Sequence, residues 1–396
     1  MPKKSVRIGG ASGYWGESAM ATPQLLGAGV DYLVYDYLAE ITMSIMARAH
    51  SKDPAAGFAG DFISEVALTA QLDACYEANN GETITYFEIT TCAALQAFTE
   101  AHADYTLLET GMGGRLDVTN VVDRPVACII TPVDLDHQQF LGDTLAKIAF
   151  EKAGILKRGV TAIVGPQQDE ALEVIERQAA NIGSPLLVHG QHWHVSVEAE
   201  RLIYQDETGL LDLPLPNLPG PHQVQNAGAA IATLRHLGMS EIACTAAVNQ
   251  AHWPARMQRL RSGPLVKNLS SNEIWLDGGH NPAAGRAIAA TLASLARRET
   301  HIICGMINTK DVQGFLAPIA EHCVSLTAIT IPNEPNAVPA ADLAAAGQAC
   351  GISSSEGGAI NQVLAGLAQH HPEARILICG SLYLAGHVLR ENDESA

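Results

Sequence analysis

The stretch YTLLETGMGGRLDVTN, residues 105–120, decides the fold. Its first five residues are an apolar run that is typical of a buried strand in a parallel sheet. Three glycines within the next five residues predict a tight turn, which begins just after Glu109 at the carboxyl end of the strand. Doubly wound α/β sheets bind their ligands at this edge, so the stretch predicts an α/β protein with a site beside Glu109. An ordinary strand-to-helix turn is the alternative.

A second apolar strand, VACIIT (126–131), is followed by Asp134, Asp136 and His137. Because the carboxyl ends of parallel strands meet at one edge of a sheet, we expect Glu109 and His137, on adjacent strands, to form a divalent-metal site. Carboxylate oxygen and imidazole are acceptable ligands for Mg²⁺ or Mn²⁺, although imidazole is unusual for Mg²⁺. A histidine that caps the following helix is the alternative.

Lys152 has an unusual place in a helical pattern. The segment 143–156 predicts a helix whose apolar face contains Leu145 and Ile148, and Lys152 follows on the same face. A lysine on a buried face must find a partner or lose its charge. Two explanations stay open: a salt bridge, for example with Glu109, or snorkelling to solvent, and an amine that is chemically altered or acts in catalysis.

The C-terminal third repeats the pattern of apolar strands that end in polar residues. The motif LDGGHNPAAG (276–285) places Asp277 at the end of a strand, and His280 just before a helix with proline in its first turn. The amino end of a helix beside a histidine is a good phosphate-binding arrangement, and a plain strand-to-helix turn is the alternative. Arg256, in WPARMQR, is placed to bridge two domains and supply positive charge. These residues predict a nucleotide between two α/β domains.

Length and composition indicate two or three folded domains. The chain has 396 residues, of which 47% are hydrophobic and 17% charged, so intrinsic disorder is excluded. The net charge of −18 argues against general binding to nucleic acid or to anionic membranes. The eight cysteines form no C-x-x-C pair, and no apolar run is long enough to span a bilayer, so we expect a cytoplasmic protein.

The pattern of strands and helices divides the chain into three blocks. Residues 1–66 contain a strand, a glycine-rich turn and helical patterns. Residues 69–258 alternate strands and helices and include a hairpin at 201–213. Residues 263–396 form a small α/β domain with a mostly parallel sheet.

The motifs become specific when they are taken in order. They resemble the bifunctional dihydrofolate synthase/folylpolyglutamate synthases of the Mur ligase superfamily, from about Thr69 to the C-terminus, and the matching segments are TYFEITT, LLETGMGGRLDVTN, DLDHQQFLGDT, EKAGILK, LPLPNLPGPHQVQNA, WPARMQR, LDGGHNP, GMINTKD and CGSLYLAG. The resemblance implies a central ATPase domain at 69–258 and a Rossmann-like C-terminal domain at 263–396. It also implies ATP-dependent ligation: ATP phosphorylates a carboxylate of dihydropteroate or a folyl-glutamate, and the amino group of L-glutamate attacks the acyl phosphate.

The resemblance implies roles for single residues as well. Glu109 and His137 would bind Mg²⁺, and Lys152 matches a lysine that family members carry as an N6-carboxylysine. Lys152 and His280 are the implied catalytic residues, and the family is typically monomeric. The implied ATP-binding residues are Asn226, Arg256, Asp277 and His280, and the implied pterin-binding residues are Thr85, Tyr86, Phe87, Glu88, Leu116, Asp117 and Val118.

The first block departs from that family. Family members begin with a phosphate-binding loop of the form G-T-N-G-K-G-[ST], and no G-x-x-x-x-G-K-[ST] occurs in this chain. The segments RIGGASGYWGES, DYLVYDYLAEITMSIMAR and KDPAAGFAGDF instead resemble the N-terminus of the acyclic terpene utilisation (AtuA-like) proteins, with a join near Val66–Leu68. The block has a strand, a glycine-rich turn and a helix in the right order, but Glu17 stands where a lysine should meet the phosphates.

Two functions follow from this combination. One is a folate-pathway ligase with strongly reduced or absent ATPase activity, because losing one electrostatic donor typically lowers a rate ~10²–10³-fold. The other is a non-catalytic fusion product with residual ligand binding, in which a missing central strand would expose an apolar sheet edge. A Rossmann dehydrogenase is disfavoured because the glycines of the first block lack the G-x-G-x-x-G spacing.

Overall fold

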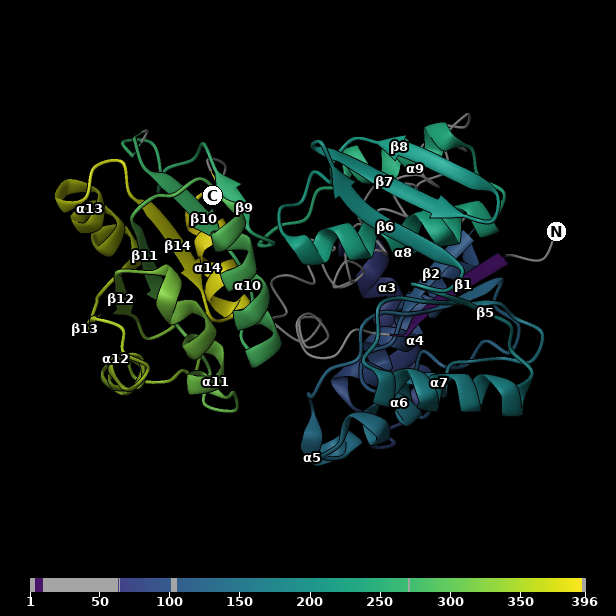
Figure 1. The fold of residues 1–396 in the computed structure, drawn as a ribbon. Coiled ribbons are helices and arrows are strands. Elements are labelled where there is room, and N and C mark those ends of the chain that lie inside the picture. The colour runs from purple at the N-terminus through teal and green to yellow at the C-terminus, as the bar shows by residue number, and fades with distance from the viewer. Residues whose placement is uncertain (1–3, 10–62, 64, 101–104, 270, 394–396) are drawn as a thin grey trace. The chain divides into compact units, whose positions relative to one another are not determined.

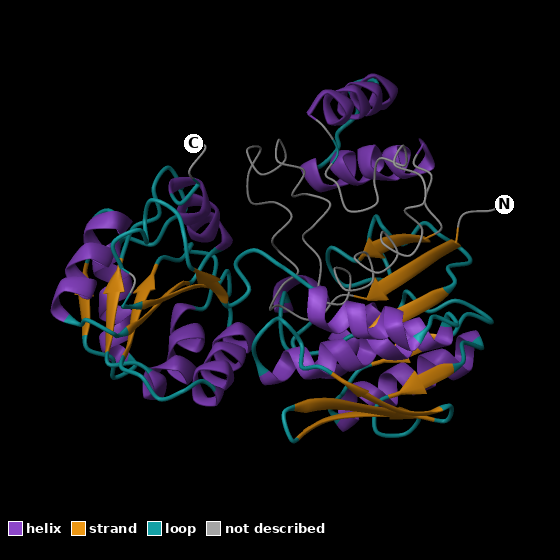
Figure 2. Cartoon of the chain, turned by 90° about the horizontal axis from the view of Figure 1, so that it is seen from above, coloured by secondary structure: helices purple, strands orange, loops and turns teal. Residues whose placement is uncertain are grey.

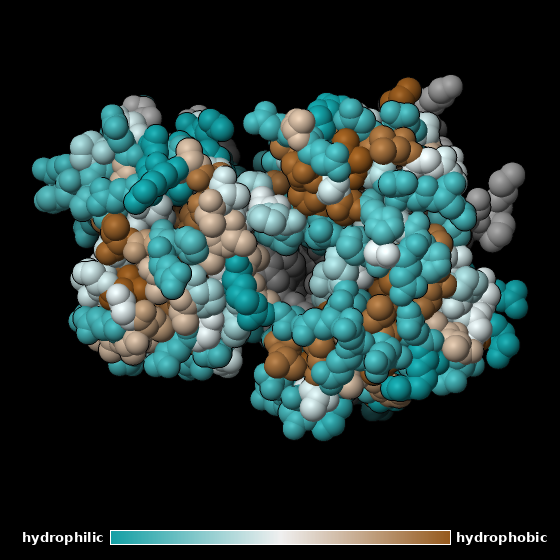
Figure 3. Space-filling model, in the orientation of Figure 1, coloured by the Kyte–Doolittle hydropathy of each residue, from teal (hydrophilic) through white to brown (hydrophobic). Residues whose placement is uncertain are grey.

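A computed structural model describes residues 4–9, 63, 65–100, 105–269 and 271–393 (Figure 1). The chain divides into two compact units, which comprise residues 1–217 with 222–252, and residues 218–221 with 253–396. None of the described helices is long and apolar enough to cross a membrane. Hydrophilic side chains cover most of the face shown in Figure 3, with apolar patches between them.

The first unit contains a five-stranded parallel sheet in the order β2-β1-β3-β4-β5. β3 and β4 consist of apolar residues that are all buried, as expected at the centre of a parallel sheet. The apolar runs therefore form the strands that the sequence predicts. The strands are β1 (Lys4–Gly9), β2 (Tyr105–Glu109), β3 (Ala127–Ile130), β4 (Ala162–Val164) and β5 (Leu186–Val188).

β1 lies inside this sheet, although the sequence assigns it to a separate block. It pairs in parallel with β2, where Ile8 lies opposite Glu109, and with β3, where Gly9 lies opposite Ile130. The expectation of a missing central strand with an exposed apolar edge is therefore wrong. The physical reason is that this six-residue strand supplies backbone partners to both of its neighbours.

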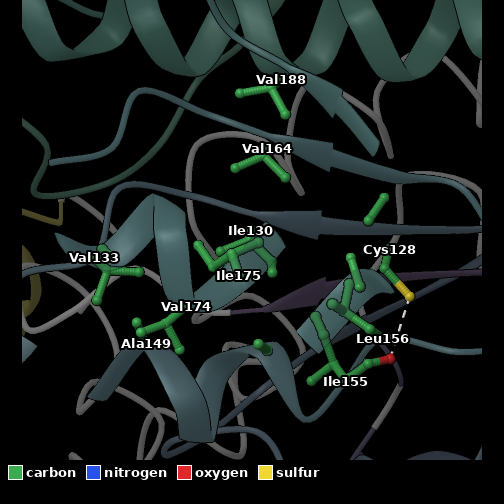
Figure 4. Close-up of a cluster of buried hydrophobic side chains, with 14 of the residues drawn as sticks. Cys128, Ile130, Val133, Ala149, Ile155, Leu156, Val164, Val174, Ile175 and Val188 are labelled. Atoms are coloured by element: carbon green, nitrogen blue, oxygen red, sulfur yellow. Dashed lines mark hydrogen bonds between the residues drawn. The ribbon is translucent and has the colours of Figure 1, made fainter. Parts of the chain in front are cut away.

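Helices α6 (Leu145–Ala153) and α7 (Asp169–Ile182) contribute apolar side chains to one buried cluster with β3 and β4 (Figure 4). In that cluster, the thiol of Cys128 lies 3.3 Å from the carbonyl oxygen of Ile155. All eight cysteines are free thiols. The unit also contains α3 (Glu65–Asn79), α4 (Tyr86–Glu100) and α5 (Gln138–Leu141).

A second, antiparallel sheet in this unit consists of β6 (Trp193–Glu198), β7 (Arg201–Asp206) and β8 (Gly209–Leu213). The predicted hairpin at 201–213 is confirmed, and β6 adds a strand that the sequence analysis misses. Helix α8 (Pro221–His236) packs closely on β6, because a Cβ on Gly228 would lie 2.6 Å from the Val195 side chain. Helix α9 (Glu241–Gln250) follows.

The second unit is the small, mostly parallel α/β domain that the sequence predicts. Its six strands are ordered β13-β12-β11-β14-β10-β9, and only β9 is antiparallel to its neighbour. Helices lie on both sides of the sheet (Figure 2). The strands are β9 (Gln258–Leu260), β10 (Glu273–Leu276), β11 (Thr300–Cys304), β12 (Ser325–Ala328), β13 (Ser354–Glu356) and β14 (Arg375–Cys379). The helices are α10 (Pro282–Ser294), α11 (Val312–Leu316), the 3₁₀ helix η3 (Ala317–His322), α12 (Ala340–Ala349), α13 (Ile360–His370) and α14 (Leu382–Glu391).

Candidate active site

The turn that follows β2 is fixed on the last turn of α6. Glu109 ends the strand and is buried. Gly114 has a φ of 154°, and a Cβ there would lie 2.8 Å from the carbonyl oxygen of Glu151. The N–H of Arg115 donates to that same carbonyl at 2.8 Å, and the Arg115 guanidinium pairs with the Glu151 carboxylate at 2.9 Å. The glycine at 114 is therefore required by a close backbone approach.

Lys152 lies beside this turn. It is buried on the same face of α6 as Leu145 and Ile148, as predicted, and only 4% of its surface is exposed. A Cβ on Gly114 would lie 3.1 Å from the Lys152 carbonyl oxygen, so the residue sits directly against the turn. This burial excludes snorkelling to solvent. An unmodified ammonium is costly in such a position, because burial disfavours the charged form.

His137 opens the short helix α5 with a left-handed backbone, at φ 48°. Its side chain makes no capping hydrogen bond, so the side-chain cap that the sequence offers as an alternative does not form. Its Nε2 lies 3.4 Å from Oδ2 of Asp136, a buried oxygen that makes no hydrogen bond within the described residues. β1 separates β2 from β3, so the prediction that Glu109 and His137 follow adjacent strands is wrong. Both strands still end at the same edge of the sheet.

The two segments predicted to bind a pterin meet at one point. A Cβ on Gly111 would collide with the ring of Phe87, so the start of α4 packs on the turn after β2. Thr85 and Glu88 form a capping box, in which the Glu88 carboxylate accepts from the hydroxyl and the N–H of Thr85 at 2.7 and 2.8 Å. These hydrogen bonds lower the pKa of the Glu88 carboxyl. Tyr86 is exposed at this helix start.

Asp117 shapes the second of these segments. Its Oδ2 accepts from the N–H of Met112 at 2.8 Å, and its Oδ1 accepts from the N–H and the hydroxyl of Thr119 at 2.9 and 2.6 Å. Both carboxylate oxygens are therefore used within the turn. Leu116 is 78% exposed, and Val118 is half-buried. Asp117 is thus a positioning residue for the turn, and the apolar side chains beside it are accessible.

In the second unit, Asp277 joins two segments. It follows β10 and is fully buried, and its two oxygens accept from the N–H groups of Met257 and Gly279 at 2.8 and 2.7 Å. Arg256 is also buried, between Ala255 and Met257, whose φ values are 55° and 40°. Such backbone conformations are strained for residues other than glycine, so they need a surrounding that holds them. Asp277 therefore positions the loop that carries Arg256.

His280 and Asn281 precede α10. The Nδ1 of His280 lies 2.9 Å from the carbonyl oxygen of Gly278, which orients the ring. The Oδ1 of Asn281 accepts from the N–H of Ala284 at 2.9 Å, and Pro282 occupies the first turn, as predicted. The Nδ2 of Asn281 is buried and makes no hydrogen bond within the described residues. A helix amino end with buried donors beside it suits an anionic group.

Asn226 lies on α8 in the first unit, where it is buried and donates to Oε1 of Gln223 at 3.1 Å. The sequence analysis does not include this contact, although Gln223 lies one helical turn before Asn226. The predicted residues fall in both units. Glu109, His137, Lys152 and Asn226 belong to the first unit, and Arg256, Asp277 and His280 belong to the second.

Lys310 lies in the loop after β11, and burial lowers its pKa to about 8. Because this is below the ordinary value of 10.5, the unfolded chain binds more protons between pH 8 and 10.5, and the stability contribution of the lysine rises with pH in that window. Lys310→Met is therefore expected to raise the free energy of unfolding at pH 7 by about 1–2 kcal/mol. We expect the difference in free energy of unfolding between Lys310→Met and the wild type to vanish near pH 10.5.

Urea unfolding of wild type and variant at several pH values measures the difference. Lys267→Met, at an exposed position of the same unit, controls for the removal of one positive charge. A difference that does not change between neutral and alkaline pH would count against a lowered pKa at Lys310.

Family models match most of the chain. The Mur ligase middle domain matches residues 57–234, and the Mur ligase glutamate ligase domain matches residues 255–382. The acyclic terpene utilisation family protein AtuA matches residues 6–84. The match to the Mur ligase middle domain and the match to AtuA overlap at residues 57–84. The predicted join between the two resemblances, near Val66–Leu68, lies within this overlap.

Sequence identity to known synthases shows which family the chain belongs to. The dihydrofolate synthase/folylpolyglutamate synthase of Escherichia coli (strain K12) is 32% identical over 343 residues, which are 84% of this chain and 76% of that protein. The chain belongs to the dihydrofolate synthase/folylpolyglutamate synthase family. The folylpolyglutamate synthase of Lacticaseibacillus casei is 30% identical over 77% of this chain and 71% of that protein. The resemblance found in the sequence is thereby confirmed.

Solved structures of synthases match the fold as well. E. coli FolC in complex with DHPP and ADP is 26% identical, with a TM-score of 0.79 over 98% of this chain and 88% of that chain. A bifunctional folylpolyglutamate synthase/dihydrofolate synthase with Mn, AMPPNP and L-glutamate bound is also 26% identical, with a TM-score of 0.78 over 98% and 89%. The Mur-ligase-type architecture is therefore confirmed, and the chain is a synthase-like amide ligase by homology.

Proposed function

We propose that the chain attaches L-glutamate to dihydropteroate or a folyl-glutamate in an ATP-dependent reaction. The γ-phosphoryl group moves from ATP to an oxygen of the substrate carboxylate, and ADP leaves. The amino nitrogen of glutamate then attacks the acyl carbon, the amide bond forms, and phosphate and a proton are released. The observation that carries the proposal is the turn after Glu109, which packs on Phe87 of α4 and against Lys152 of α6. The contact of this turn with Phe87 and with the backbone of Lys152 supports the roles proposed for the pterin-binding segments and for the lysine.

The residues after β2 and β3 fit a divalent cation such as Mg²⁺. Glu109 contributes a buried carboxylate, and Asp136 contributes a buried oxygen with no hydrogen bond within the described residues. The His137 imidazole lies next to Asp136. Carboxylate oxygens are the ligands that Mg²⁺ prefers, and a bound cation would neutralise the charge of the transferring phosphate.

Lys152 is proposed to carry a carboxylated amine. The neutral amine adds to CO₂, an N–C bond forms, and a proton is released, so a buried cation becomes an anion with two ligand oxygens. The burial of Lys152 supports this, because it disfavours the ammonium form.

The remaining predicted ATP-binding residues are proposed to contact ATP because their side chains or neighbouring N–H groups suit its parts. Asn226 offers an amide that can pair with a polar ring edge, such as that of adenine. Arg256 offers positive charge from a loop that Asp277 positions. The amino end of α10, with His280 and Asn281 in front of it, offers N–H groups to a phosphate.

We propose a low rate of glutamate ligation because the chain lacks the lysine of a phosphate-binding loop. No lysine occurs between Lys4 and Lys52, and the glycine-rich turn after β1 therefore lacks the lysine of a phosphate-binding loop. β1 ends at Gly9, between the ends of β2 and β3, at the edge of the sheet where Glu109 lies. Glu17 and the rest of residues 10–62 lie outside the described residues.

Incorporation of labelled L-glutamate into dihydropteroate tests the proposal. Purified chain with Mg-ATP is expected to form product only when ATP is present, at a rate about 10²–10³-fold below that of the E. coli synthase in the same assay. A rate equal to that of the E. coli enzyme would contradict the role given to the missing lysine. Complete absence of product at high enzyme concentration would contradict ligation itself.

A non-catalytic fusion product with residual ligand binding is the second candidate. Two observations favour it: the AtuA match over residues 6–84, and the absence of G-x-x-x-x-G-K-[ST] from the sequence. Titration calorimetry with Mg-ATP and dihydropteroate separates the candidates, because binding without turnover would support the fusion product. A monomeric state and a cytoplasmic location stay predictions, and gel filtration of the purified chain checks the first.

A further inference from the structure

Three possible metal ligands meet at the amino end of β11. Glu299 precedes this strand, His301 is its second residue, and His371 directly follows α13. β10, β11 and β14 are parallel, so the amino end of β11 lies at the opposite edge of the sheet from Asp277, which follows the carboxyl end of β10. None of the roles proposed above uses this cluster.

The distances within the cluster fit a metal ion. Oε1 of Glu299 lies 3.5 Å from Nε2 of His301 and 3.3 Å from Nδ1 of His371. The ligand atoms of all three residues lie within 4.8 Å of one another, and the two imidazole centroids are 4.0 Å apart. Tetrahedral zinc, with bonds of about 2.0–2.1 Å, separates neighbouring ligand atoms by about 3.3–3.4 Å. Small side-chain movements would therefore complete the geometry.

His301 is oriented to present one nitrogen to a ligand. Its side chain is 2% exposed, and its Nδ1 lies 2.7 Å from the hydroxyl oxygen of Ser325 on the neighbouring strand β12. If Nδ1–H donates to that hydroxyl, Nε2 carries the free lone pair, as in metal-binding histidines whose other nitrogen is hydrogen-bonded. Nε2 is buried and makes no hydrogen bond within the described residues.

The backbone holds the other two ligands in place. The N–H of Arg375 donates to the carbonyl of Glu299 at 2.8 Å, which fixes the start of β11 to the start of β14. The N–H of His371 donates to the carbonyl of Leu367 at 2.8 Å, and the His371 carbonyl accepts from Nδ2 of Asn272 at 2.9 Å. Glu299 is half exposed, so an ion and a water molecule can reach the cluster from solvent.

We propose that Glu299, His301 and His371 bind a transition-metal cation of the zinc class, with water as the fourth ligand. Two imidazoles and one carboxylate with an open position form a ligand set of zinc sites, and imidazole favours transition metals over Mg²⁺. The ion would tie the amino end of β11 to the segment between α13 and β14. Zinc binding would therefore stabilise the second unit.

Titration of the EDTA-treated full chain with ZnCl₂ tests this proposal by calorimetry and by thermal unfolding. The wild type is expected to bind one equivalent more than His371→Ala. Zinc at a hundredfold excess over its Kd is expected to raise the Tm of the wild type by about 5–10 °C and to leave that of His371→Ala unchanged. Glu299→Gln keeps the shape of the ligand without its charge, and it is expected to weaken binding at least ~10-fold.

His370→Ala is the matched control, because it removes an exposed histidine next to His371 whose Nδ1 lies 2.8 Å from the carbonyl oxygen of Gly366. This variant is expected to retain the zinc equivalent and the Tm shift. Equal zinc binding in wild type and His371→Ala, or no zinc effect on the wild-type Tm, would overturn the proposal. If His371→Ala does not fold, the zinc affinity of Glu299→Gln decides instead: an affinity equal to that of the wild type would overturn the proposal. The readouts are independent of ligase activity.

Discussion

Lys152→Arg is expected to lower the rate of ATP-dependent glutamate incorporation by at least about 100-fold. Arginine keeps the length and the positive charge, but its guanidinium stays protonated and cannot add CO₂. Lys152 is buried against the turn that follows Glu109, so a permanent cation there replaces the proposed carbamate with the opposite charge. The measurement is the initial rate of labelled glutamate incorporation, relative to that of the wild-type chain.

Lys147→Arg is the matched control, because Lys147 lies on the same helix but is exposed and pairs with Asp143 at 2.7 Å. Its rate is expected to equal that of the wild type. A wild-type rate in Lys152→Arg would contradict a carboxylated lysine. A ¹³C NMR signal from labelled bicarbonate, present in the wild type and lost in Lys152→Arg, gives a readout that does not depend on turnover, and the Tm of both variants reports whether α6 remains folded.

Gly285→Ala is expected to lower the free energy of unfolding of the second unit by about 3 kcal/mol or more. Gly285 lies inside α10, and a Cβ there would collide with the carbonyl oxygen of Phe315 in α11. A backbone carbonyl cannot rotate away as a side chain can, and Phe315 is itself fully buried. The two helices would have to separate, and urea unfolding of the purified variant measures the cost.

Gly366→Ala provides the matched comparison within the same unit. Gly366 also lies inside a helix, α13, but no atom lies within 4 Å of a Cβ at this position. Alanine is expected to stabilise the unit there by about 0.5–1 kcal/mol, because it restricts the unfolded chain and favours the helix. Effects of the same sign at both positions would contradict the close packing of α10 on Phe315.

Local patterns predict much of the fold and part of the candidate site. The apolar runs predict β2 and β3, because strands buried in a parallel sheet are predominantly apolar. The helical spacing of Leu145, Ile148 and Lys152 predicts correctly that the lysine is buried. Asn281 and Pro282 predict the start of α10 by their capping chemistry.

Contacts between distant segments could not be predicted in the same way. The sequence of β1 does not indicate which strands it pairs with. Because β1 lies between β2 and β3, two predictions are wrong: that a central strand is missing, and that Glu109 and His137 follow adjacent strands. The packing of Phe87 on Gly111 and the meeting of His301 with His371 likewise depend on tertiary structure. No local periodicity records such contacts.

The central place of β1 has a kinetic consequence. During synthesis, residues 4–9 leave the ribosome well before both of their partner strands, which lie about 100–120 residues further along the chain. At about 5–20 residues per second, β1 waits about 5–25 s for β2 and β3. Closing such a long segment carries an entropic cost before any pairing is gained, and this makes folding slow. The pairing of β1 with β2 can therefore form only once residue 109 has emerged, and the pairing with β3 only once residue 130 has emerged, so translation speed sets the earliest time at which this sheet assembles.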